Sequence, residues 1–191
     1  MNLPKSVPFA AALTALVLCA APASGLAAAA DPAFAAFTTV CGEPAGDFAA
    51  VRAAADAHAW GAAEATTDSA MPGVTIGERL TRGSNAGGVS LVLSAWRGAT
   101  TKGVKVSACT VHVAKSDFGA LREAATAWLA FAPADSADNK KAVYRFTDKD
   151  GAHHALAASE YDAAAGGAGL EILTVSGDAN GTLVDLLVIK K

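Results

Sequence analysis

GVKVSACTVHVAK, residues 103–115, has the alternating apolar pattern of a β-strand and carries a cysteine in its middle. Its apolar positions begin at Val104 and Val106, then shift by one residue and continue from Cys109. A shift of one residue moves the apolar side chains to the other face of a strand. The pattern therefore predicts a β-bulge, or a change of the buried face, near Ala108.

Similar strand-like runs lie on both sides of this stretch. The runs at 73–83 and 88–98 alternate apolar and polar residues, and the segments that join them are rich in glycine. The turn sequences DKDG and GDANG predict two later hairpins. The predicted strand pairs are 142–148 with 152–160, and 169–176 with 182–190. The segments on either side of the first hairpin, ADSADNKK and DAAAGGAG, are predicted to be loops.

Two segments have the apolar periodicity of amphipathic helices. The first covers 46–61, with Asp47 as its predicted N-cap and Gly61 as its predicted stop. The second begins at Ser116, the predicted N-cap, and ends before Pro133. The predicted apolar stripes are Phe48, Val51, Ala55, His58 and Ala59 in the first helix, and Phe118, Leu121, Ala125, Trp128, Leu129 and Ala132 in the second.

Together these elements predict an α+β fold, with a mainly antiparallel sheet of six to seven strands backed by two helices. The helix starts resemble each other, DFAAVRAAA at 47–55 and DFGALREAA at 117–125, and three strand-like runs follow each. One interpretation is two α-β-β-β units plus a closing strand. The alternative is chance similarity, because alanine-rich helices with the same caps look alike.

The first 30 residues have the order of a secretory signal peptide. Lys5 lies near the start, an apolar run covers 9–21, and small residues continue up to Asp31. The apolar run is shorter than the roughly 20 residues that cross a bilayer. Residues 1–30 are therefore predicted to be a cleaved signal peptide.

Cleavage is expected after Ala30, with cleavage after Gly25 as the alternative. Lipid attachment at Cys19 is disfavoured because Leu18, directly before it, is not a small residue. The mature chain, 31–191, is predicted to be a single α+β domain in the periplasm or secreted, with no integral membrane segment.

Two cysteines, Cys41 and Cys109, remain in the mature chain after removal of the signal. In an oxidising compartment a single possible pair predicts a disulfide. The alternative is two separate buried thiols. A metal site is not predicted, because no CxxC motif or cluster of cysteine and histidine surrounds either residue.

Charge and motifs exclude several classes of function. The chain has 15 Lys and Arg against 18 Asp and Glu, a net charge of -3, without a basic block. Nucleic-acid binding depends on neutralising phosphates, so no nucleic-acid partner is expected. The chain also lacks the P-loop, GxGxxG, HExxH and GxSxG motifs, and no cofactor is predicted.

Tryptophan and arginine are enriched in binding hot spots. A small group of such residues, with an acid, would share neighbouring strands if the first two strand-like runs form a hairpin: Glu78, Arg82, Trp96 and Arg97. These four are the candidate binding residues. The alternative is a solvated ion pair beside a core tryptophan.

Histidines and acids give no clear catalytic set. His58 is expected in the core and His112 is expected to face outward, while the adjacent His153 and His154 should point to opposite faces of a strand. Two opposed carboxyl groups could hydrolyse glycosides. The sequence does not select a pair among the candidates Glu78, Glu160, Glu171 and Asp185.

We therefore expect an exported, non-catalytic binding or accessory module, with another envelope protein or a small ligand as its partner. The alternative is a hydrolytic enzyme whose site is assembled from dispersed residues, including His112 or Asp185. The alternative predicts a concave pocket that holds at least two titratable groups with shifted pKa values.

Overall fold

The computed structural model describes residues 31–62, 71–137, 140–178 and 180–191. The predicted signal peptide, 1–30, lies outside the described residues. The strands are β1 (Gly61–Ala62), β2 (Val74–Ala86), β3 (Val89–Thr100), β4 (Lys105–Ala114), β5 (Asp135–Ala137), β6 (Lys141–Lys149), β7 (Ala152–Ala155), β8 (Leu170–Asp178) and β9 (Gly181–Lys190). The helices and helical turns are α1 (Pro32–Phe37), η1 (Thr38–Gly42), α2 (Phe48–Ala57), α3 (Phe118–Leu129), η2 (Ala158–Glu160) and α4 (Tyr161–Gly166).

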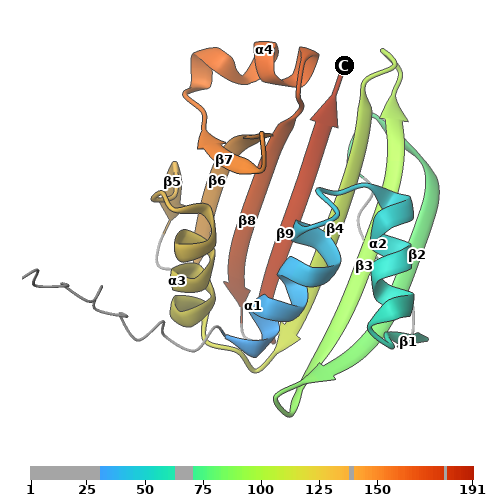
Figure 1. Ribbon diagram of the computed structural model, residues 1–191, viewed down its shortest axis with the longest axis vertical. Helices are drawn as coiled ribbons and strands as arrows, with labels where there is room; N and C mark the ends of the chain where they lie inside the picture. Colours follow the sequence, from blue (N-terminus) through green and yellow to red (C-terminus); the bar gives the residue numbers. More distant parts are fainter. Residues whose placement is uncertain (1–30, 63–70, 138–139, 179) are drawn as a thin grey trace, which may run out of the picture.

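In the described part of the chain, all nine strands belong to one antiparallel sheet, in the order β1-β2-β3-β4-β9-β8-β6-β5, with β7 paired to β6 (Figure 1). The central neighbours are β4 and β9, so the two halves of the described chain meet in the middle of the sheet. The antiparallel α+β class is confirmed. The predicted six to seven strands and two helices are too few.

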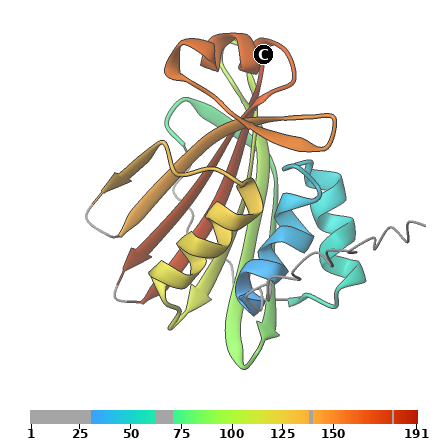
Figure 2. The same cartoon turned by 60° about the vertical axis from the view of Figure 1, so that its left-hand side comes forward.

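The helices α1, α2 and α3 all cover one side of the sheet, which we call the helix face (Figure 1). Figure 2 shows α3 over one half of the sheet, with α1 and α2 over the other. The main core lies between these helices and the sheet, and includes Leu93 of β3, Val111 of β4 and Leu186 of β9, all fully buried. We call the opposite side of the sheet the second face.

The shift of apolar positions in β4 is not a β-bulge. β4 pairs with β3 and β9 without interruption, so its side chains alternate regularly. Cys109 and Val111 point to the helix face, whereas Val106 and Ala108 pack with Trp96 in a separate small cluster on the second face. The apolar pattern changes because successive parts of this strand are buried on opposite faces.

The predicted helix ends are partly wrong. Asp47 caps α2 as predicted, because its carboxylate accepts a backbone N–H bond of 2.9 Å from the first turn. The predicted cap Ser116 is wrong, since Asp117 accepts the equivalent bond in α3. α2 ends before the predicted stop Gly61, where Ala59 adopts a left-handed conformation with φ of 56°.

Several short elements were not expected, among them α1, β5, α4 and η2, and η2 occupies the end of the predicted strand 152–160, of which only Ala152–Ala155 pairs with β6. α1 begins after Asp31, whose carboxylate accepts a 2.9 Å bond from a backbone N–H, with proline at the first helical position. The predicted loop ADSADNKK contains β5, and the predicted loop DAAAGGAG forms most of α4. Both predicted loops are therefore corrected. The glycines of the second lie at or beyond the helix end, where they are tolerated.

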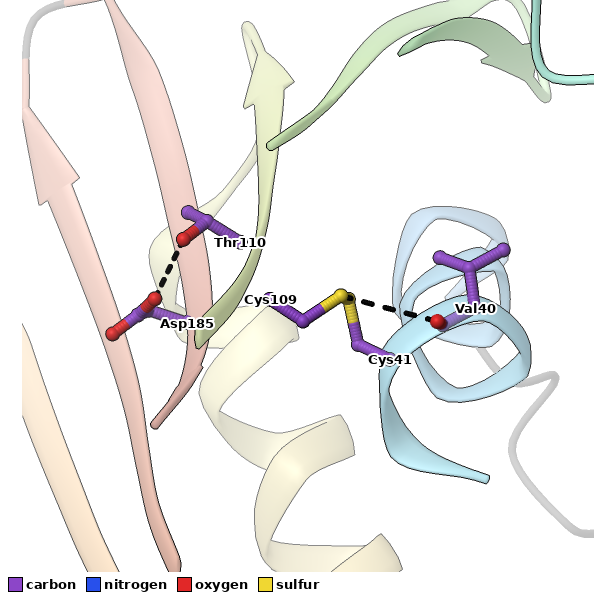
Figure 3. The surroundings of a disulfide bond; sticks show 5 residues. All are labelled: Val40, Cys41, Cys109, Thr110 and Asp185. Carbon is purple, nitrogen blue, oxygen red and sulfur yellow. Dashed lines mark hydrogen bonds between the residues drawn. A yellow bond between two sulfur atoms is a disulfide. The ribbon is translucent and has the colours of Figure 1, made fainter. Parts of the chain in front are cut away.

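The predicted disulfide is present between Cys41 on η1 and Cys109 on β4 (Figure 3). Both side chains are fully buried, and 68 residues separate them in sequence. Gly42 lies against the Trp128 indole, because a Cβ at this position would be 3.0 Å from the ring. Phe37 of α1 also meets Trp128 edge-on, with 6.3 Å between centroids. The bond therefore fixes α1 and η1 to the middle of the sheet, where they contact α3.

Replacing both cysteines by alanine is expected to lower the free energy of unfolding by about 4 kcal/mol, because the unfolded chain regains the entropy of the closed loop. Urea unfolding followed by circular dichroism measures the change. Reductant should cause a comparable loss in the parent protein and none in the variant. A loss below about 1 kcal/mol in both experiments would contradict a structural role for the bond.

Candidate functional site

A cleft of about 600 Å³ lies on the helix face, beside the N-terminal end of α2. Its walls are the turn that enters α2 and the ends of β2, β3, β4 and β9. Lys105 and Ser107 reach the cleft because they precede Cys109 at two-residue intervals on β4 and so share the helix face.

Glycines shape this cleft. Gly46 in the turn has φ of 67°, and a Cβ there would be 2.5 Å from the Val188 side chain, so the turn can press against β9. A Cβ at Gly98 would overlap the carbonyl oxygen of Thr75, so glycine allows β2 and β3 to approach. The register of β2 shifts at Gly77, where the β-bulge of this sheet half lies.

Arg97, on β3, is held in the cleft by two contacts. It forms an ion pair with Glu78 on β2, and its guanidinium lies 5.7 Å from the centre of the Phe48 ring. Arg52 of α2 also contacts Glu78, at 3.6 Å, and lies 5.0 Å from the same ring. Exposed ion pairs add little stability, so the main consequence is the position of the Arg97 guanidinium.

The structure separates the four predicted binding residues. β2 and β3 form the expected hairpin, and Glu78 lies opposite Arg97. Of the four, Arg97 lines the cleft, and Glu78 positions it. Arg82 lies farther along β2 and pairs with Asp56 at 3.9 Å. Trp96 is buried on the second face, so it does not share a surface with the other three.

Sequence reasoning missed the two lysines of the cleft, Lys105 and Lys190. They lie directly opposite each other across β4 and β9. The strand pattern could have placed Lys105 in phase with Cys109, on the helix face. No local signal pairs β4 with the last strand, so the sequence alone does not bring the lysines together.

Glu171 of β8 is a buried acid, 6 % exposed, on the helix face. The pKa of its carboxyl is raised to about 7: burial is the largest cause and the charge of Asp148 acts in the same direction, while Lys190 and the Asp148 backbone lower the pKa. His153 lies opposite Asp148, and its ring centre is 4.4 Å from that of Trp128. Lys190 thus lies between the cleft and this acidic group.

The other catalytic candidates lie apart. His58 is exposed at the end of α2, which corrects the expected core position. His112 and Asp185 both occupy the second face, where the carboxylate of Asp185 accepts a 2.6 Å bond from the Thr110 hydroxyl (Figure 3). Glu171 is not among the residues that line the cleft. The arrangement does not join these groups in one pocket.

Three further findings bear on function. Within the described ranges, no three His, Cys, Asp or Glu side chains lie together as a potential metal site. No helix in the described part of the chain is long and apolar enough to cross a membrane. No protein family, curated protein or solved structure matches this chain.

Glu171→Gln is expected to reduce the pH dependence of stability between about pH 4.5 and 7. In the folded protein the pKa of Glu171, about 7, exceeds the ordinary value of 4.5. Protonation of Glu171 adds up to about 3 kcal/mol to the free energy of unfolding. This contribution is fully present below pH 4.5 and is lost as the pH rises through 7. Glutamine cannot ionise, so the stability of the variant relative to the parent should rise across this window.

Chemical denaturation of parent and variant between pH 4 and pH 8 measures this difference. Glu123→Gln, at an exposed position of α3, is the matched control and should leave the pH profile of the parent unchanged. Equal profiles for the parent and Glu171→Gln would contradict the burial argument.

Proposed function

We propose that the mature chain is an exported, non-catalytic binding module whose ligand site is the cleft beside α2. The observation that carries this proposal is the volume of the cleft, about 600 Å³, which is within the range of small-molecule sites. The positive φ of Gly46 and the close approach of strands at Gly98 form its walls, so backbone geometry builds the cleft.

Pre-organisation supports a binding role. The turn that forms one wall begins directly after η1, which carries Cys41. The disulfide ties this segment to β4, which supplies another wall. A site whose walls are already ordered loses less conformational entropy when a ligand binds.

Export is supported by two features. The first 30 residues have the composition of a signal peptide, and the buried disulfide is compatible with an oxidising compartment outside the cytoplasm. In such a compartment the disulfide would persist without a redox role. A small molecule is favoured over an envelope protein as partner, because the cleft is concave and small.

A hydrolytic enzyme is the second candidate, and one observation favours it. A carboxyl group with a pKa near 7, such as Glu171, suits general acid–base chemistry at neutral pH. Asp148, whose charge raises this pKa, would be the second carboxylate. The binding function is preferred because Glu171 is buried outside the cleft lining.

A screen of neutral, cationic and anionic fragments should show binding in the cleft. The protein, exported with its disulfide intact, is labelled with nitrogen-15, and amide resonances are followed by NMR. At least one class of fragment is expected to shift the resonances of Gly46, Gly98 and Ser107, which line the cleft.

Ala99→Phe, which adds a ring to the cleft lining, should abolish these shifts. Ser90→Phe is the matched control, since it adds the same ring to an exposed position of the same strand on the other face. Shifts that persist in Ala99→Phe, or the absence of shifts with every fragment class, would contradict the proposed site.

A further inference from the structure

Lys105 and Lys190 form a like-charged pair at the edge of the cleft. They are direct partners in the register of β4 and β9, so both side chains leave the sheet on the helix face. Side chains at such positions begin about 4.5–5.5 Å apart, and like charges directly opposite each other are destabilising. The fold therefore places two lysine side chains side by side at the edge of the cleft, where a ligand could enter.

Two of the nearby acids, Asp47 and Glu78, are engaged with other groups. The carboxylate of Asp47 caps α2 through a backbone N–H of that helix. Glu78 is bound by two arginines. Glu171 interacts electrostatically with Lys190, but burial, the largest effect, leaves the pKa of its carboxyl raised, at about 7. Below this pH the carboxyl is mostly neutral and does not offset the charge of Lys190. The ion pairs found among the described residues involve other cations: Arg52, Arg82, Arg97 and Lys191.

A third cation completes the group. Arg97 lies opposite Ser107, which is two residues from Lys105 on the same face of β4. The three cations thus come from the adjacent strands β3, β4 and β9, and Ser107 of β4 also lines the cleft. Because Glu78 and the Phe48 ring already hold the Arg97 side chain, this guanidinium loses little freedom when it binds an anion.

We infer that the cleft binds the oxyanion group of a small organic molecule, a carboxylate or a phosphate, between Lys105, Lys190 and Arg97. An oxyanion accepts hydrogen bonds from all three cations and removes the repulsion between the lysines. The cleft is also lined by Ala45, Phe48 and Val188, so the rest of the ligand is small and apolar. The inference depends on the proposed binding function.

Titration by NMR with four compounds tests the inference. Phenyl phosphate and benzoate should shift the cleft amides, and their ranking identifies the preferred oxyanion. Benzyl alcohol, a neutral compound of similar size, should bind at least about tenfold more weakly, and inorganic phosphate should bind more weakly than phenyl phosphate because it lacks the apolar body. Raising the salt from about 20 to about 500 mM should weaken binding of the anions.

The double variant Lys105→Met/Lys190→Met should bind the better anion at least about tenfold more weakly. Lys140→Met/Lys141→Met removes the same charge from exposed positions outside the cleft and should bind as the parent does. Without ligand, Lys105→Met alone should raise the melting temperature by about 1–3 °C, because it removes the like-charged pair.

Two results would overturn the inference: equal binding of benzyl alcohol and the anions, or unchanged anion affinity in the cleft double variant. If neutral or cationic fragments shift the cleft amides and anions do not, the oxyanion assignment fails while the binding function stands. If no compound of any class shifts these amides, both fail.

Discussion

The disulfide between Cys41 and Cys109 is the constraint on which the rest of the structure depends. It attaches η1 to β4, one of the two central strands of the sheet, at a point where both cysteines are fully buried. From this point α1 reaches toward α3, and the chain continues into the turn that forms one wall of the cleft. A covalent bond between two residues 68 positions apart in the sequence therefore positions α1, η1 and one wall of the candidate site.

The parts of the fold that were predicted correctly depend on local chemistry. Short turn sequences set the hairpin between β8 and β9, and alternation sets the strands between 74 and 114. The cysteine pair could be predicted because only one pairing was possible in the mature chain. Other contacts between segments that are distant in the sequence leave no such local pattern and were not predicted. The pairing of β4 with β9 and the burial of Trp96 on the second face follow from tertiary packing.

The candidate site was predicted only in part, for the same reason. The contact between Glu78 and Arg97 follows from a hairpin, so local pattern was sufficient to bring them together. Lys190 joins them only through the closing strand, which a pass along the sequence cannot place. The bulge at Gly77 also changes which side chains of β2 face the helices. Trp96 and Arg97 are adjacent on β3, so alternation places them on opposite faces, and the four candidate residues have no common face.

Amide hydrogen exchange, compared between the oxidised and the reduced protein, tests most directly whether the disulfide holds the helical layer and the cleft wall in place. Among amides that exchange by local opening and not through global unfolding, the account predicts exchange at least about tenfold faster in residues 32–57 after reduction, with changes below about twofold in α3 and in the hairpin of β8 and β9. Unchanged exchange in 32–57, or an equal increase throughout the described chain, would contradict it.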